Sequence, residues 1–163
     1  MYENGYRLNI GIVLCNDADR LFWARRINHD GWQFPQGGLR CTESPEEALY
    51  RELYEEVGLR PEHVRVLGCT SDWLCYDLPL HMRRAPRRKG FRGQKQKWFL
   101  LRFVGADASI RLDCSGRPEF DEWRWVEFWD PVKQIVEFKR DVYQRALSEL
   151  EPLLSDAEAV RRA

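Results

Sequence analysis

The segment spanning residues 37–59 constrains this chain more than any other, because it predicts a helix with an acidic side. Glu52, Glu55 and Glu56 are spaced i, i+3 and i+4, so a helix of 3.6 residues per turn places them within an arc of roughly 100°. Like charges at these spacings destabilise a helix. We therefore expect the three carboxylates to hold a hard divalent cation such as Mg²⁺, which prefers oxygen ligands and keeps waters and substrate phosphates in its shell.

Both ends of this helix carry local signals. Residues 44–47 (SPEE) offer an N-cap serine, a proline at the first helical position and a glutamate that can close a capping box. Gly58 suits the left-handed position just past the last turn. These signals predict a helix over residues 45–57.

Hydrophobic patterning predicts the remaining elements. Strands are expected at residues 6–15, 21–26, 64–76, 97–104 and 123–128, with a break in the third one near Ser71. A second long helix is expected over residues 138–150, and Pro152 should end or kink it. The pattern favours the α/β class, with a mixed β-sheet between helices.

The length of 163 residues fits one domain, which we place at residues 1–152, followed by a frayed tail at residues 153–163. The formal net charge of zero gives no overall attraction to nucleic acid. Five cysteines without a C-x-x-C pair argue against a disulfide framework and a zinc site, and they fit a reduced, cytoplasmic protein. We see no signal peptide and no apolar stretch long enough to span a membrane, and we expect a monomer.

The acidic segment resembles the Nudix box, G-x5-E-x7-R-E-U-x-E-E-x-G-U, in which U is a bulky aliphatic residue. All nine specified positions are filled, by Gly37, Glu43, Arg51, Glu52, Leu53, Glu55, Glu56, Gly58 and Leu59. The alternative, a surface helix with an acidic face, accounts for neither the glycines nor the arginine. The resemblance implies an α/β/α sandwich and a metal-dependent hydrolase of phosphoanhydride bonds.

The same resemblance implies roles for individual residues. The expected metal ligands are Gly37, through its carbonyl group, and Glu52, Glu55, Glu56 and Glu119. Glu52 is the first candidate for the catalytic base and Glu119 the second, although Glu119 is also readable as an exposed loop acid. Glu43 and Arg51 are expected to pair and to brace the loop against the helix. The expected cofactor is Mg²⁺, with Mn²⁺ as the alternative.

Several stretches outside the box are similar to bacterial RNA pyrophosphohydrolases, among them residues 32–38 (WQFPQGG), 93–99 (GQKQKWF) and 138–143 (FKRDVY). Members of that family convert the 5′-triphosphate end of RNA to a 5′-monophosphate with release of pyrophosphate, which promotes RNA decay. The same group includes dinucleoside polyphosphate hydrolases, and these motifs do not separate the two substrates. A third reading is a non-catalytic nucleotide- or RNA-binding module, and the intact box carboxylates count against it.

This closer resemblance implies a set of substrate-binding residues: Arg7, Arg26, Gln36, Lys95, Lys97, Phe138 and Lys139. By this resemblance, Phe138 and Lys139, with Arg26 opposite, should form a cleft for a base. Stacking of a base on the aromatic ring would contribute about 1–3 kcal/mol to binding. Phe138 reads equally well as the first core residue of its helix. Residues 81–93 (HMRRAPRRKGFRG) contain six Lys and Arg residues, which either attract polyphosphate or form a solvated loop.

Overall fold

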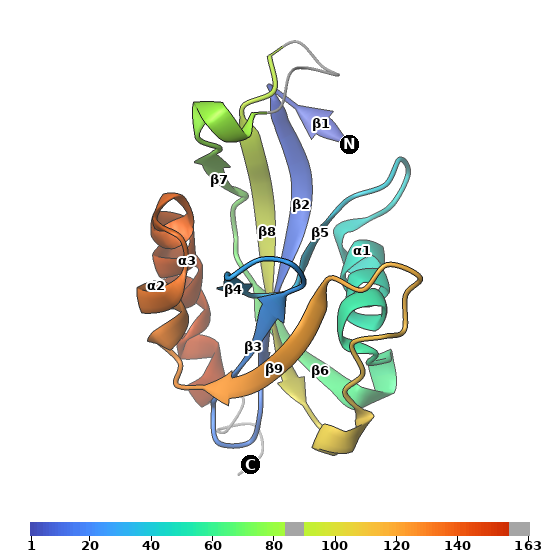
Figure 1. The fold of residues 1–163 in the computed structure, drawn as a ribbon. Helices are drawn as coiled ribbons and strands as arrows, with labels where there is room; N and C mark the ends of the chain where they lie inside the picture. The colour runs from blue at the N-terminus through green and yellow to red at the C-terminus, as the bar shows by residue number, and fades with distance from the viewer. Residues whose placement is uncertain (84–89, 157–163) are drawn as a thin grey trace.

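The computed structural model describes residues 1–83 and 90–156. Figure 1 shows one mixed sheet with α1 (Pro45–Glu52) on one side and both α2 (Asp130–Gln134) and α3 (Glu137–Leu150) on the other. This arrangement confirms the expected α/β/α sandwich. Among the helices of the described residues, none combines the length and the apolar character needed to cross a bilayer.

The sheet is built around one parallel pair of strands. Its strands are β1 (Tyr2–Glu3), β2 (Tyr6–Cys15), β3 (Leu21–Arg26), β4 (Trp32–Gln33), β5 (Gln36–Gly38), β6 (Val64–Cys69), β7 (Leu74–Asp77), β8 (Gly93–Phe103) and β9 (Phe120–Val126). The main order is β4-β3-β2-β8-β6; β1 and β5 also pair with β2, β7 pairs with β8, and β9 pairs with β3. Only β2 and β8 are parallel among these pairs, and together they form the centre of the sheet.

Alternate residues of β2 enter two different cores. Ile12 belongs to the cluster on the α1 side, together with Leu49. Val13 belongs to the cluster on the α3 side, together with Leu147. Successive side chains of a strand point to opposite faces, so the part of β2 covered by helices on both faces, residues 10–15, is apolar on both.

The acidic helix begins and ends where its local signals predict, but its last turn is wider. Ser44 forms the capping box with Glu47, and Gly58 ends the helix at a φ of 74°. From Leu53 to Val57, however, the chain forms a π-helical turn instead of continuing the α-helix. Single π turns are rare in helices and are frequently found at functional sites.

Other elements match the expectations with shifted ends. β2 and β3 have the expected bounds, whereas β8 and β9 begin earlier than predicted. The predicted break in the third strand separates β6 from β7. The short elements β1, α2, and the 3₁₀ turns Pro61–His63, Leu80–Met82 and Asp107–Ser109 were not predicted. Residues 152–156 are helical and Leu154 is buried, so the packed part of the chain extends past the boundary expected at residue 152.

Candidate active site

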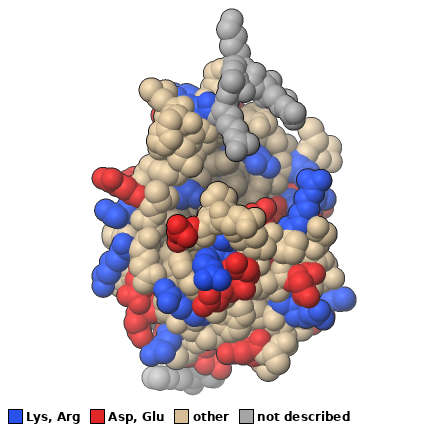
Figure 2. Space-filling view, in the orientation of Figure 1, with Lys and Arg blue, Asp and Glu red and all other residues tan. Residues whose placement is uncertain are grey.

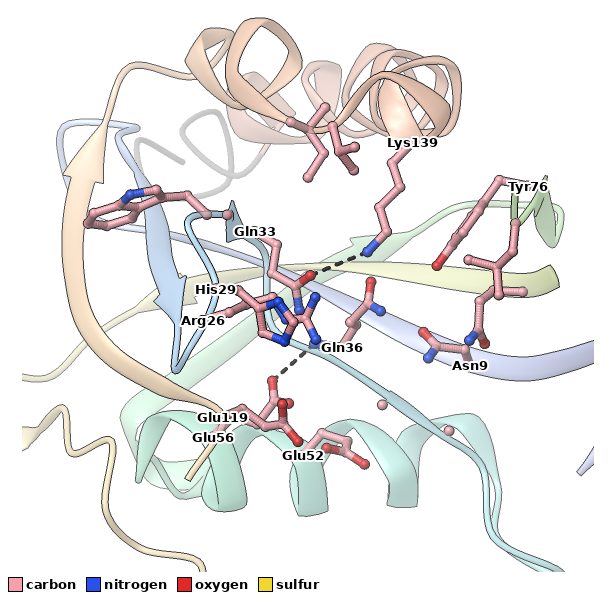
Figure 3. Close-up of a pocket in the computed structure, with 18 of the residues that line it drawn as sticks. Asn9, Arg26, His29, Gln33, Gln36, Glu52, Glu56, Tyr76, Glu119 and Lys139 are labelled. Carbon is pink, nitrogen blue, oxygen red and sulfur yellow. Dashed lines mark hydrogen bonds between the residues drawn. The ribbon is translucent and has the colours of Figure 1, made fainter. Parts of the chain in front are cut away.

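A cavity of about 940 Å³ lies between the acidic helix and α3. Figure 3 shows its two walls: Glu52 and Glu56 extend from the side of α1, and Lys139 extends toward them from α3. Gln36, on β5, lies between the walls. The cavity therefore places carboxylates and a cation at opposite sides of one open cleft.

The acidic wall is formed by carboxylates that repel one another. Glu52 and Glu56 are only 7% and 5% exposed, and Glu119 joins them from the segment before β9. Burial raises the pKa of Glu56 well above its ordinary value, and the negative charges of Glu52 and Glu119 raise it further. Burial also raises the pKa of Glu52, against the opposing effect of Arg51. Such a cluster is stabilised by a positive charge placed among its members.

Strand β5 lies directly against these carboxylates. The backbone N–H of Gln36 donates a hydrogen bond to Glu56 Oε2 at 3.0 Å. A Cβ atom on Gly37 would lie 1.9 Å from the carboxyl carbon of Glu52, so any side chain at this position would displace the Glu52 carboxylate. The close approach brings the Gly37 backbone to the acidic group.

Arg51 joins the acidic helix to the loop before it. Its guanidinium donates to both carboxylate oxygens of Glu43, at 2.6 and 2.8 Å, and to the carbonyl oxygen of Gly38 at 3.0 Å. The hydrogen bonds from Arg51 to Glu43 lower the pKa of Glu43 to about 2. The same guanidinium contacts Glu52 and, at 3.4 Å, Glu55. Arg51 thus has the geometry expected of the brace, and it also reaches the acidic wall.

The residues of the acidic wall fit a divalent cation, although their side chains are not closed around one point. In residues 1–83 and 90–156, no three His, Cys, Asp or Glu side chains lie close enough together to hold an ion as they stand. Glu52 and Glu55 are instead engaged by Arg51 and Arg40. The available donors are nevertheless oxygen atoms alone, which suits Mg²⁺ or Mn²⁺. The mutual repulsion around Glu56 is the feature that a cation relieves.

The opposite wall presents a buried cation. Lys139 is 7% exposed, and its ammonium donates to Gln33 Oε1 at 3.3 Å and lies 5.7 Å from the centre of the Tyr76 ring. Burial lowers the pKa of Lys139 to about 8, with a further contribution from the positive charge of Arg26. Within the described residues, no carboxylate forms an ion pair with Lys139.

Three further residues expected to contact substrate line the same cavity. Arg7 and Arg26 both line it, and among the described residues neither of them forms an ion pair with a carboxylate. Phe138 lines it as well, and its ring lies 6.0 Å from the ring of Tyr76. Phe138 also packs against the α3-side core, as one sequence interpretation predicted, and its contact with a base stays a prediction. These positions leave an excess of positive charge on the side facing the carboxylates.

Lys95 and Lys97 do not line the cavity, contrary to expectation. Lys95 pairs with Glu3 at 2.8 Å, and the Lys97 ammonium donates to the carbonyl oxygen of Ser71 at 3.0 Å. The alternation of β8 explains this result, because the neighbouring residues Gln94 and Gln96 face the cavity side and the lysines the other side.

Several cavity residues were missed by sequence reasoning: Asn9, Gln33, Tyr76 and Gln94. Tyr76 and Gln33 carry no distinctive local signal. The strict alternation of Gln and Lys in residues 94–97 was a usable signal, because it separates the two faces of a strand. Read with that period, it assigns the amides and the ammonium groups to opposite faces.

The basic segment at residues 81–93 falls partly outside the described residues, which exclude Arg84, Arg87, Arg88 and Lys89. Of its other basic residues, Arg83 and Arg92 each pair with Asp77 at 3.4 Å. On the face shown in Figure 2, Lys and Arg side chains are interspersed with Asp and Glu. That face therefore has no extended surface of one charge.

Comparisons with known proteins agree with this architecture. A NUDIX domain model matches residues 5–146. RNA pyrophosphohydrolases of Ectopseudomonas mendocina and Alkalilimnicola ehrlichii are 58% and 59% identical over 152 residues, covering 93% of this chain and 96% and 84% of theirs. The structure of a C. elegans Ap4A hydrolase binary complex superposes with a TM-score of 0.66 at 18% identity, covering 92% of this chain and 98% of that one, and shows the same fold. The chain is a member of the Nudix domain family.

Proposed function

We propose that this chain hydrolyses a phosphoanhydride bond at the triphosphorylated 5′ end of RNA, releasing pyrophosphate and leaving a 5′-monophosphate. High identity to RNA pyrophosphohydrolases over nearly the whole chain supports this substrate. The observation that carries the proposal is the pairing of two walls in one cavity, one with buried carboxylates and one with unpaired cations. In cells, this reaction would promote RNA decay.

The substrate is bound by the basic wall, which consists of Lys139 on α3, Arg26 on β3 and Arg7 on β2. These three residues lack carboxylate partners among the described residues, so they are free to pair with phosphate oxygens. Phe138 offers an aromatic ring beside them for a terminal base. Because the cleft is lined by groups of both kinds, it suits a substrate with a polyphosphate joined to a nucleoside.

The acidic wall performs the chemistry. Mg²⁺ or Mn²⁺ would be held by Glu52, Glu55, Glu56, Glu119 and the carbonyl group of Gly37. When bound, such a cation neutralises phosphate charge and makes water more acidic. The raised pKa of Glu52 suits a carboxylate that takes the proton from the attacking water, and Glu119 is the second candidate for this role. The water oxygen bonds to phosphorus as the bond to the pyrophosphate oxygen breaks.

The test is a product analysis with purified protein and Mg²⁺ or Mn²⁺. Triphosphorylated RNA should yield monophosphorylated RNA and pyrophosphate, and Glu56→Gln should yield neither. The exposed Glu151→Gln serves as the matched control and should behave like wild type. Hydrolysis of diadenosine tetraphosphate is measured in the same buffer. A kcat/KM much larger for this dinucleotide than for RNA would show that the dinucleotide is the substrate instead. Absence of cleavage of both substrates would support a binding module instead.

A further inference from the structure

A buried cluster of side-chain amides lies beneath the floor of the cavity. Gln96 on β8 is fully buried, and its Nε2 donates to Asn9 Oδ1 at 2.9 Å and to Gln36 Oε1 at 3.2 Å. Asn9 is 3% exposed and is the register partner of Gln96 across the parallel β2–β8 pair. Gln96 itself does not line the cavity, but both of its partners do.

An amide is unexpected at this position of β8. The next residues on the same face, Trp98 and Leu100, belong to the α3-side core. A buried amide costs stability unless its polar atoms are satisfied, and Gln96 Oε1 has no hydrogen-bond partner among the described residues. An apolar side chain would suit the core better, so the amide serves a purpose other than packing.

Gln36 receives contacts from three directions. Gln96 donates a hydrogen bond to its side chain, and Tyr76, whose pKa the Gln36 side chain lowers, lies beside it on the Lys139 side of the cavity. Its backbone N–H donates to Glu56, on the acidic wall. The next residue along the chain, Gly37, touches the Glu52 carboxylate. A shift of Gln36 would therefore displace the backbone against which the carboxylates are aligned.

We propose that Gln96 is a positioning residue, which acts through Gln36 to hold the backbone of β5 in hydrogen-bonding position against Glu56. This inference rests on the proposed function, because it deepens the account of the same site. Gln96 touches neither the substrate nor the reacting atoms. Its effect reaches the acidic wall through one side-chain hydrogen bond and one backbone hydrogen bond.

The experiment combines kinetics with hydrogen exchange. Gln96→Met keeps the length of the side chain and removes both donated hydrogen bonds. Because a displacement of about 1 Å at a site is costly, kcat should fall about tenfold or more, while KM changes less than about threefold. Exchange of the Gln36 backbone N–H should accelerate about tenfold, whereas the Ile12 N–H, which bonds to the Pro35 carbonyl oxygen at 2.9 Å, should keep its protection.

Two further variants separate positioning from a general loss of stability. Gln144 is an exposed glutamine on α3, so Gln144→Met is the matched control and should change neither kcat nor exchange at Gln36. Gln36→Met removes the same contact from the half-buried cavity side, and it keeps the inference testable if Gln96→Met does not fold. In the Gln36→Met background, a further Gln96→Met substitution should lower kcat less than twofold, since the shared contact is already lost.

Several outcomes would overturn the inference. A folded Gln96→Met protein with normal kcat would do so, as would kcat losses that multiply in the double variant, because Gln96 would then not act through Gln36. Unchanged exchange at Gln36 in either single variant would have the same meaning. A wild-type protein that releases no pyrophosphate from triphosphorylated RNA contradicts the proposed function instead, and the exchange measurement still decides whether Gln96 positions β5.

Discussion

Glu56 and Lys139 lie on opposite walls of one cavity, and within the described residues neither of them forms an ion pair. Each is more than nine-tenths buried. A buried charge without a partner destabilises the folded protein, so both residues lower the free energy of unfolding.

Glu56→Gln should abolish turnover and stabilise the protein. The pKa of Glu56 is raised in the folded state, so its contribution to stability is lost as pH rises from about 4.5 through the folded pKa. At neutral pH the substitution removes this loss, and the unfolding midpoint should rise by about 3 °C or more. The rate should fall at least about a hundredfold. A near-normal rate at saturating Mg²⁺ would contradict the role of Glu56.

Mg²⁺ should stabilise the wild-type protein against thermal unfolding. A cation bound among Glu52, Glu56 and Glu119 relieves their repulsion, and any ligand of the folded state raises the unfolding midpoint with its concentration. The measurement is a thermal scan over increasing Mg²⁺, with a chelator as the reference. Glu56→Gln should show a much smaller rise. An equal rise in both proteins would place the ion elsewhere.

Lys139→Met should weaken substrate binding and remove its pH dependence. The pKa of Lys139 is lowered to about 8, so the ammonium is present at pH 7 and is lost as pH rises through 8. Wild-type KM should therefore increase between pH 7 and pH 9, whereas the KM of the variant should be flat and about tenfold higher at pH 7. Lys133→Met, at an exposed position on α2, is the matched control. A wild-type KM that does not vary over this range would count against a cationic role.

Glu43→Gln should flatten the acid dependence of stability. The pKa of Glu43 is lowered from 4.5 to about 2, so its contribution is fully present above about pH 4.5 and is lost as pH falls toward 2. Urea unfolding of the wild-type protein should lose stability over this window, and the variant should lose about 1–3 kcal/mol less. Identical slopes in both proteins would show that the pair with Arg51 contributes nothing measurable.

The parts of the structure that were predictable depend on local chemistry. Ser44 and Gly58 act within one turn of the helix that they delimit, so its ends could be placed from the sequence. The strand formers of residues 6–15 likewise predicted β2 with its correct bounds, although not its central place in the sheet. The π turn after Glu52 could not be foreseen, because no residue in it breaks an α-helix and its geometry depends on packing against the rest of the protein.

In the candidate site, too, the features set by local sequence could be predicted and those set by long-range contacts could not. The spacing of Glu52 and Glu56 within one helix predicted that they would lie together, and they do. The face of β8 presented to the cavity depends on its register with β2, which joins residues far apart in the chain. That long-range register placed Lys95 away from the cavity, and local resemblance could not reveal it. Tyr76 was missed for the same reason, since β7 reaches the cavity only through its pairing with β8.

The narrow gap between Gly37 and Glu52 has a consequence for protein engineering. Even one added methyl group at residue 37 would push the Glu52 carboxylate out of its place, so a side chain here would disturb the acidic wall. The opposite wall comes from α3 and is not subject to that steric limit. Altered substrate preference should therefore be sought by randomising the α3 wall, leaving the hydrolytic machinery untouched.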